Sequence, residues 1–241
     1  RRSSDLLGQY VIDVTFADQH SQTFFTVAAY RPPEFEVVLA AEQNEIQRGD
    51  DLEATVTLSY FFGGPLKDTN VTWNVLARPF FFEPPWGGRY SFNDADSPYR
   101  CFFCWWWEPS RPEPVLSGEG TTDEKGQVQI NVSGEALAEA LEEGAKTLII
   151  EANATGPDNQ QIAGRTSVTV HPGPYYIGLR SQSYVTSAGE EAAVDLVTVD
   201  WEGERRADLA VKVTFYRREW VNTFVETASG GGRWTWETKE T

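Results

Sequence analysis

The residues with the most evident chemical potential lie between positions 99 and 114. Cys101 and Cys104 are the only cysteines of the chain, and two residues separate them. Tetrahedral zinc would need two further ligands, but the only histidines, His20 and His171, are far away in the sequence. A redox pair of the thioredoxin type is expected at a helix N-terminus, whereas the flanks here are aromatic and rich in proline. We therefore predict neither a metal site nor redox catalysis, and no cofactor.

The spacing of Cys101 and Cys104 favours a disulfide. Residues three apart across a turn can bring their Cα atoms within the roughly 4.4–6.8 Å that a disulfide requires. Closing so small a loop removes little chain entropy, so the bond would fix local shape more than it would stabilise the fold. Two reduced, unpaired cysteines are the alternative. A paired state would agree with an extracytoplasmic location.

Five aromatic residues surround the cysteines, namely Phe102, Phe103, Trp105, Trp106 and Trp107. In an extended chain Trp105 and Trp107 share one face and Trp106 takes the other. Burying two tryptophans removes on the order of several hundred square ångströms from water. We expect the segment to fold back onto a sandwich or to fill a groove between domains. Contact with another domain or a partner, and anchoring to a membrane or ligand, are the functional alternatives.

Composition narrows the classes of protein. The 241 residues predict about two domains, and 40% hydrophobic residues suffice for packed cores. A net charge of −16 argues against nucleic-acid binding, which needs clustered lysine and arginine. No apolar run approaches the roughly 20 residues of a membrane span. No Ser-His-Asp arrangement or acid/base carboxylate pair stands out, so we expect no enzyme. Because the chain contains no methionine, we expect it to be a segment of a longer protein.

Alternation of apolar residues predicts an all-β fold. Strands with one buried face recur along the chain, and turn sequences rich in glycine, aspartate and proline separate them. This pattern is typical of tandem antiparallel β-sandwich domains of the immunoglobulin or fibronectin-III kind. The alternating positions are Tyr10, Ile12, Val14 and Phe16; Phe35, Val37, Leu39 and Ala41; Leu52, Ala54, Val56, Leu58 and Tyr60; Val71, Trp73 and Val75; Val128, Ile130 and Val132; Leu148, Ile150 and Ala152; Val168 and Val170; and Leu209, Val211, Val213 and Phe215.

One short helix is expected within residues 133–146. Ser133 can cap its first turn, and Glu135 complements the positive end of the helix. Gly144 can close it in the left-handed conformation. At about two and a half turns it is too short to be stable alone, so we expect it to lie against a sheet edge.

Two proline-rich segments divide the chain. Proline restrains the backbone to extended geometry and ends hydrogen-bonded ladders, so these segments predict stiff inter-domain joints. We expect the closing strands of a preceding domain at 1–30 and a complete domain at 31–172 with an aromatic insertion at about 78–118. The opening strands of a following domain are expected at 173–241. The joint residues are Tyr30, Pro32, Pro33 and Phe35 in the first joint, and Pro172 and Pro174 in the second.

The two terminal pieces each lack the strands of a full sandwich. Unpaired strand edges invite pairing with another chain. We expect residues 1–30 and 173–241 either to pair with each other across molecules, as a strand-swapped homodimer, or to be poorly ordered.

Residues 29–37 read AYRPPEFEV, a joint of the form Y-x-x-P-x-F-x-V. This joint and the flanking segments resemble the alpha-2-macroglobulin family, and the bacterial branch fits best. Residues 60–66, YFFGGPL, followed by 71–73, VTW, resemble the hairpin that comes about 25 residues later. Residues 120–126, GTTDEKG, resemble a family turn, and 176–179 with 199–203 resemble the opening strands of the next macroglobulin-like domain. The motifs occur in the same order and spacing over nearly the whole chain.

The resemblance implies a scaffold segment of a broad-range endopeptidase inhibitor. In that family a protease cuts a bait segment, and the multidomain body rearranges around the protease. Many members carry a thioester in a Cys-Gly-Glu-Gln-like motif, which is missing here because no Glu-Gln follows Cys101 or Cys104. The implied partners are the neighbouring domains of the full-length protein and, through it, target endopeptidases. The implied location is secreted, periplasmic or anchored at the cell surface.

Two other classes are compatible with the sequence. A stalk or adhesin module of immunoglobulin-like repeats could bind a cell-surface partner through the aromatic loop at 99–114. A carbohydrate-binding module would rest on exposed tryptophans alone.

Overall fold

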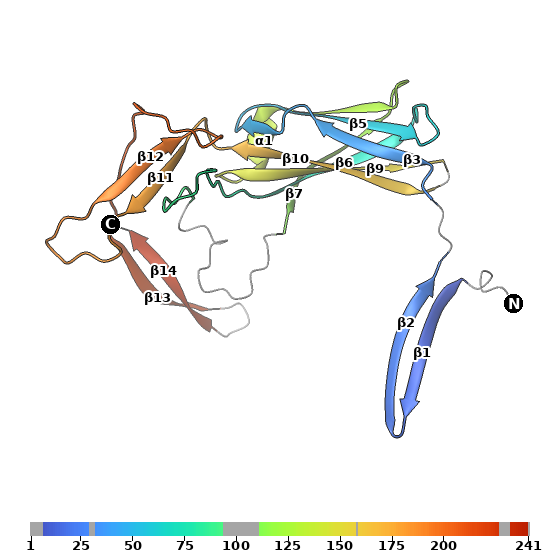
Figure 1. Cartoon of the computed structure of the whole chain (residues 1–241), viewed down its shortest axis with the longest axis horizontal. Coiled ribbons are helices and arrows are strands. Elements are labelled where there is room, and N and C mark those ends of the chain that lie inside the picture. The colour runs from blue at the N-terminus through green and yellow to red at the C-terminus, as the bar shows by residue number, and fades with distance from the viewer. Residues whose placement is uncertain (1–6, 29–31, 94–110, 158, 227–231, 241) are drawn as a thin grey trace.

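Two packed sheets form the middle of the chain (Figure 1). The computed structural model describes residues 7–28, 32–93, 111–157, 159–226 and 232–240. One sheet has five strands in the order β4(Glu45–Gln47), β10(Gln161–His171), β9(Lys146–Thr155), β6(Asn70–Pro79) and β7(Glu113–Thr121). The other has three in the order β3(Phe35–Ala41), β5(Leu52–Tyr60) and β8(Gln127–Val132). All neighbours are antiparallel except β4 and β10, which are parallel. We call this unit the middle sandwich.

The period-two pattern explains why these segments form strands. In β5, Leu52, Ala54, Val56 and Leu58 all point into the core and are fully buried, and the residues between them are more exposed. Because successive side chains of a strand take opposite faces, one alternating run yields one apolar face. The same alternation buries Leu148, Ile150, Ala152 and Ala154 of β9 on the facing sheet. The predicted all-β sandwich fold is confirmed.

The short helix is α1(Gly134–Ala140), and its start follows the prediction. The Ser133 hydroxyl accepts a hydrogen bond of 3.3 Å from the Ala136 backbone N–H. Gly134 packs so closely that a Cβ there would lie 1.8 Å from the carbonyl oxygen of Gly49. The predicted closure by Gly144 is wrong: the helix ends earlier, because Leu141 turns into extended geometry and is buried. Gly144 keeps its positive φ of 90° in the loop that follows.

Arg48 holds the end of α1, and its removal is the first test of this packing. Its guanidinium donates hydrogen bonds to the carbonyl oxygens of Ala138, Leu141 and Glu142 at 2.8, 2.8 and 2.9 Å. These carbonyls have no intrahelical partner, so a charged donor satisfies them and complements the helix dipole. We expect Arg48→Ala to lower the free energy of unfolding by about 1.5–3 kcal/mol, measured by urea unfolding.

Arg48→Lys is the matched control for this prediction. It keeps the positive charge but loses the planar guanidinium that reaches several carbonyls at once. Its free energy of unfolding should therefore lie between those of Arg48→Ala and the unchanged protein. A stability of Arg48→Ala equal to that of the unchanged protein would contradict the assigned role.

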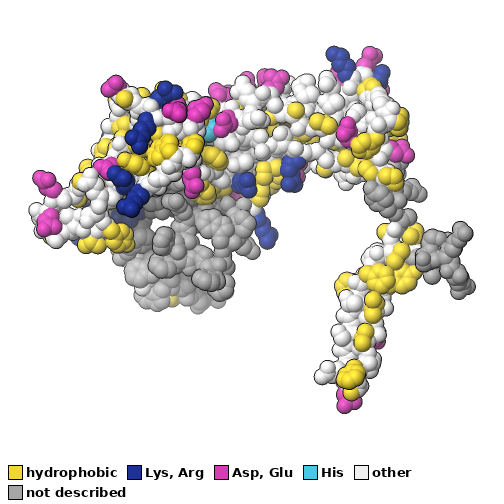
Figure 2. Space-filling model, viewed as in Figure 1, with side chains coloured by type: hydrophobic (Ala, Val, Ile, Leu, Met, Phe, Trp, Pro, Cys, Tyr) yellow, Lys and Arg dark blue, Asp and Glu magenta, His cyan; other side chains and the backbone are white. Residues whose placement is uncertain are grey.

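Three two-stranded sheets flank the middle sandwich. They are β1(Gly8–Phe16) with β2(Gln19–Val27), β11(Tyr176–Ser181) with β12(Val194–Val199), and β13(Arg218–Glu226) with β14(Gly232–Glu240). The β1–β2 hairpin stands away from the middle sandwich, and apolar side chains run along its surface (Figure 2). Its register places Tyr10, Ile12, Val14 and Phe16 on one face, where Tyr10 stacks on Phe25 at 5.4 Å.

The predicted strand at 209–215 is wrong. Residues 206–217 form no strand, and Val213 and Phe215 are exposed. Alternation makes a strand only where a neighbouring strand pairs with it, and a short apolar run gains nothing by extending alone.

Candidate functional site

Part of the predicted site lies outside the described residues. Cys101, Cys104, Phe102, Phe103 and the three tryptophans at 105–107 fall there, and so does Tyr30. Of the other residues predicted for the first joint, Phe35 is the first residue of β3 and is buried in the core of the middle sandwich, whereas Pro32 is exposed. The second joint is described completely.

The second joint is a four-residue connection between two buried residues. β10 ends at His171, and residues 172–175 lead to Tyr176, the first residue of β11. Pro172 and Pro174 are exposed, but His171 and Tyr176 are buried on either side of them. The imidazole Nδ1 of His171 lies 2.7 Å from the Tyr176 hydroxyl. A single hydrogen bond therefore links the last residue of the middle sandwich to the next sheet.

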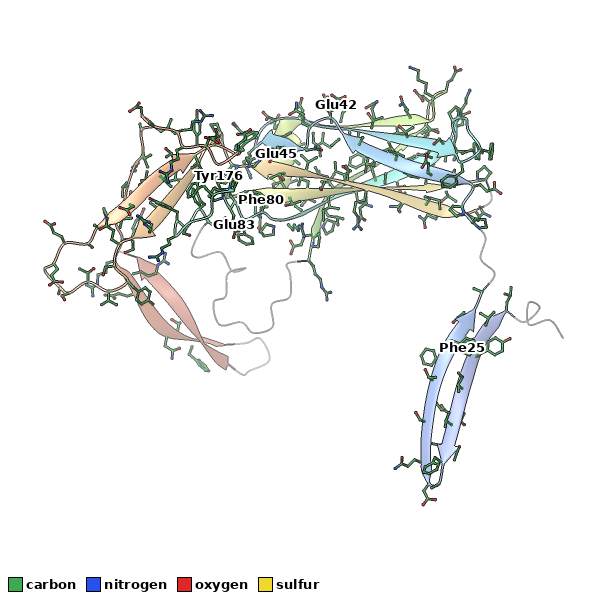
Figure 3. All side chains as sticks on the ribbon, viewed as in Figure 1. Phe25, Glu42, Glu45, Phe80, Glu83 and Tyr176 are labelled. Atoms are coloured by element: carbon green, nitrogen blue, oxygen red, sulfur yellow. The ribbon has the colours of Figure 1, made fainter. Side chains whose placement is uncertain are left out.

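An aromatic cluster closes around His171. Its imidazole stacks on Trp201, with ring centroids 4.2 Å apart and planes inclined by 13°. Phe80 contacts the same ring edge-on at 5.9 Å. The indole N–H of Trp201 donates to the Gly173 carbonyl at 2.8 Å, so the turn after β12 also holds the proline-rich joint. Figure 3 labels Phe80 and Tyr176 where the middle sandwich meets β11.

Residues 80–93, which leave the middle sandwich after β6, lie against β11, and we call them the brace segment. Phe82 stacks on Tyr176 at 4.0 Å with nearly parallel planes. Ser91 and Leu179 exchange backbone hydrogen bonds in both directions, at 2.8 and 2.9 Å. The Trp86 indole N–H donates to the Gly203 carbonyl at 2.7 Å. The first part of the predicted insertion thus packs against the β11–β12 sheet and forms a short β-bridge with β11.

Cations of the C-terminal part cover the outer side of the brace segment. The guanidinium of Arg180 lies 4.9 Å from the centre of the Tyr90 ring, and that of Arg205 lies 5.2 Å from the Trp86 ring. Arg180 also pairs with Asp195, with Nε 2.9 Å from Oδ2. The hydrogen bond from Gln182 and then the one from Arg180 hold the pKa of Asp195 below its usual value. Both aromatic faces are therefore paired with fixed positive charge.

The tight turn after β12 shapes the other wall of the joint. Gly203 adopts a φ of +84°, which favours glycine, and its backbone N–H donates to the Asp200 carbonyl at 3.1 Å. The Asp200 carboxylate accepts hydrogen bonds from the Glu204 N–H and from Arg206, both at 2.8 Å. Desolvation would raise the pKa of Asp200, but these hydrogen bonds outweigh it and hold the pKa below its ordinary value. The turn keeps Trp201 in place against His171.

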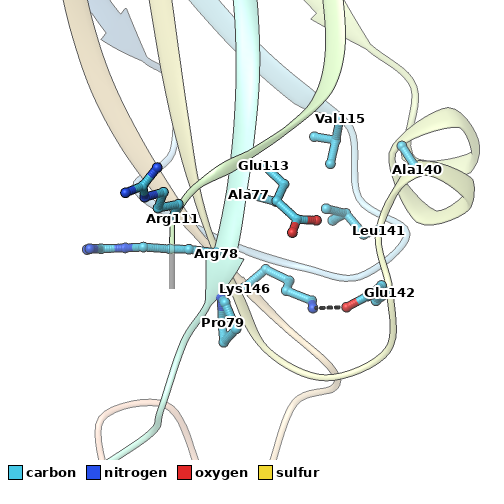
Figure 4. Close-up of a pocket in the computed structure, with 10 residues that line it drawn as sticks. All are labelled: Ala77, Arg78, Pro79, Arg111, Glu113, Val115, Ala140, Leu141, Glu142 and Lys146. Atoms are coloured by element: carbon cyan, nitrogen blue, oxygen red, sulfur yellow. Dashed lines mark hydrogen bonds and ion pairs between the residues drawn. The ribbon is translucent and has the colours of Figure 1, made fainter. Parts of the chain in front are cut away.

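A small pocket lies beside the end of α1 (Figure 4). It encloses about 80 Å³, and half of its ten lining residues are charged, among them Arg78, Glu113 and Lys146. The Lys146 ammonium pairs with Glu142 at 3.2 Å. Sites for small molecules typically enclose about 300–1,000 Å³, so this pocket is too small for one.

The described residues offer neither a metal-binding cluster nor a membrane-spanning helix. They contain no cluster of three histidine, cysteine, aspartate or glutamate side chains arranged to hold a metal ion. None of their helices has the length and apolar character needed to cross a membrane.

The architecture by itself indicates a class of protein. A two-sheet sandwich, antiparallel except for the β4–β10 pair, is followed at a packed joint by two strands of another sheet, as in chains of tandem β-sandwich domains. Solved structures agree. The chain is similar to native Escherichia coli alpha-2-macroglobulin, with a TM-score of 0.61 and 16% identity over 98% of this chain and 15% of that one. For the Escherichia coli alpha-2-macroglobulin activated by porcine elastase, the TM-score is 0.60 and the identity is 17%, over 99% of this chain and 20% of that one. The macroglobulin-like fold class is confirmed.

The relatives found by sequence then give the resemblance a name. An alpha-2-macroglobulin homolog of Nostoc sp. is 22% identical over 185 residues, which is 75% of this chain and 9% of the relative. The alpha-2-macroglobulin of Thermotoga maritima is 23% identical over 198 residues, 82% of this chain and 11% of the relative. No family model matches the chain. The resemblance to bacterial alpha-2-macroglobulins is thus confirmed, and the chain spans about a tenth of the length of the curated relatives it matches.

Most of the residues that fill this joint were not predicted from the sequence. His171, Pro172 and Pro174 were expected in the joint, with His171 also weighed and set aside as a metal ligand. Packing by Phe80, Phe82 and Trp201 was not predicted. A signal was present, because residues 80–86 read FFFEPPW, an aromatic and proline run next to a strand end. Such a run indicates a packed, irregular segment, but it does not identify the partner surface.

Proposed function

We propose that this chain is a scaffold segment of an alpha-2-macroglobulin-like, broad-range endopeptidase inhibitor, and that it carries no catalytic activity. The joint between the middle sandwich and β11 is the observation that carries the proposal. Buried rings, the Ser91–Leu179 bridge and the Trp86–Gly203 hydrogen bond hold the β11–β12 sheet against the middle sandwich. A protein whose domains move together around a bound protease needs packed joints, so that the movement of one domain also moves the next.

We assign the domain boundaries on the same basis. The domain at 31–172 is supported by the middle sandwich, whose strands run from Phe35 to His171. The pieces at 1–30 and 173–241 are assigned to neighbouring domains, because two-stranded sheets with exposed apolar faces need further strands to cover them. Neighbouring domains of a longer protein would be their partners. In isolation, the same faces would drive formation of a strand-swapped homodimer, which light scattering would detect as a doubled mass.

We place the inhibitor outside the cytoplasm, as a secreted, periplasmic or cell-surface-anchored protein. There it would meet foreign endopeptidases, and a Cys101–Cys104 disulfide would persist. The aromatic loop around these cysteines is assigned a contact with a neighbouring domain.

The decisive experiment compares this chain with the longer protein that the proposal requires. Each is mixed in stoichiometric amounts with an elastase-type endopeptidase, and cleavage of a protein substrate is followed beside cleavage of a small peptide. We expect the chain alone to leave both rates unchanged. The longer protein should suppress cleavage of the protein substrate more strongly than cleavage of the peptide, since enclosure excludes large substrates first. Inhibition by the chain alone would overturn the scaffold role, and no inhibition by the longer protein would overturn the inhibitor class.

A further inference from the structure

His171 is a buried imidazole at the joint with one unsatisfied nitrogen. Its side chain is 1% exposed, and its Nδ1 is used by the Tyr176 hydroxyl. Nε2 is also buried and makes no hydrogen bond within the described part of the chain. The Glu45 carboxylate is the anionic group in ion-pair range, with Oε1 at 3.5 Å from Nε2. Buried polar atoms are seldom left unpaired, so the site calls for an explanation.

Four elements pack around this imidazole and present few ionisable groups to it. β4 presents Glu45, β11 presents the Tyr176 hydroxyl, and the turn after β12 places Trp201 against the ring and Glu202 nearby. The segment after β6 contributes the ring of Phe80. Arg48, which follows β4, donates its backbone N–H to the His171 carbonyl, but its guanidinium is directed to the end of α1. The surroundings therefore combine aromatic faces with two carboxylates.

The closed joint fits the neutral imidazole better than the charged one. A neutral ring satisfies the Tyr176 hydroxyl in either tautomer, whereas a second proton would place a cation among buried rings. Glu45 offsets this only in part, because its side chain is 53% exposed and its charge is screened by water. Burial accordingly lowers the pKa of His171 below its ordinary value, although Glu45 and Glu202 act in the opposite direction.

We propose that His171 makes this joint acid-sensitive, so that protonation of its imidazole releases the β11–β12 sheet from the middle sandwich. With the joint open, the imidazole reaches water and titrates near its ordinary pKa of about 6.5. The closed state then binds fewer protons than the open state at mildly acidic pH. Stability of the joint is therefore complete above about pH 6.5 and falls as pH drops below it. This inference does not depend on the proposed inhibitor function.

The chain is well suited to a direct test, because it has only two histidines. NMR of the imidazole signals, assigned with His20→Gln and His171→Gln variants, gives the titration of His171 in the intact chain. Amide hydrogen exchange of β11, corrected for the intrinsic rate, gives the opening constant at the same pH values. We expect His171 to titrate below about 6.5 and the opening constant of β11 to rise about fivefold or more from pH 7.5 to 5.0. Exchange in β5 and β9 should not change.

Two variants separate this mechanism from general acid lability. His171→Phe keeps an aromatic ring in the cluster but cannot titrate, so the response of β11 to pH should disappear. Glu45→Gln removes the carboxylate that favours the charged ring, so the response should become larger. Titration of His171 above about 6.5, an unchanged opening constant across this range, or a full acid response in His171→Phe would each overturn the proposal.

Discussion

Replacing Phe82 with alanine is expected to release the β11–β12 sheet while the middle sandwich stays folded. The Phe82 ring is 4% exposed and lies between Tyr176, at 4.0 Å, and Phe92, at 5.4 Å. It belongs to a small core cluster whose other buried members are Tyr176 and Val199. Few neighbouring side chains are therefore able to fill the space that its removal leaves. Truncating a buried phenylalanine typically costs about 3–5 kcal/mol, and two strands have little stability to lose.

Hydrogen exchange resolved by segment measures this effect. We expect the amides of β11 and β12 to lose protection in Phe82→Ala, while those of β5 and β9 keep it. Phe81→Ala is the matched control, since Phe81 is a half-buried neighbour outside this core cluster and should have a much smaller effect. Phe82→Leu, which keeps apolar volume but loses the stacking, should be intermediate. Full protection of β11 in Phe82→Ala would show that the brace segment does not hold the joint.

Phe35→Ala is expected to be the most damaging change within the middle sandwich. Phe35 is 1% exposed, begins β3 next to the first proline joint and belongs to the core cluster to which both sheets contribute. Removing its ring leaves a cavity that the strands cannot close without breaking register, so we expect a loss of about 3–5 kcal/mol. The measurement is the urea unfolding transition followed through the protection of β5 and β9.

Val38→Ala is the control for this prediction. Val38 lies three residues further along β3 on the opposite face and is 49% exposed. Its truncation should change stability by less than about 1 kcal/mol, because little buried surface is lost. Equal effects of the two substitutions would mean that β3 does not face the core as described.

The sequence predicted the fold well where local pattern and tertiary burial agree. β5 alternates without interruption and pairs on both sides, so the period of its apolar residues translates directly into a buried face. The run ending at Phe215 has the same period, but none of the described strands pairs with it. Periodicity describes which side chains could be buried together, and only neighbouring chain can bury them.

The errors at the helix and the joint have a non-local origin. Gly144 is a sound local signal for a helix end, but burial of Leu141 and the reach of Arg48, more than 90 residues away in sequence, end the helix earlier. The two prolines of the second joint marked where the chain changes domain. The rings that fill the joint come from the end of β6 and the turn after β12. No feature of either segment's sequence indicates that it packs against the other, so this contact could not be predicted.

The strand order of the middle sandwich gives its two ends different mechanical strength. The chain leaves towards Pro172 through β10, which is hydrogen-bonded to β4 on one side and β9 on the other. It enters from residue 34 through β3, an edge strand that pairs with β5 alone among the described strands. Tension along the chain therefore meets two hydrogen-bonded ladders at one end and a single ladder at the other. A domain chain pulled from both sides would begin to yield at β3, and the packed joint around His171 would remain with the part that stays folded.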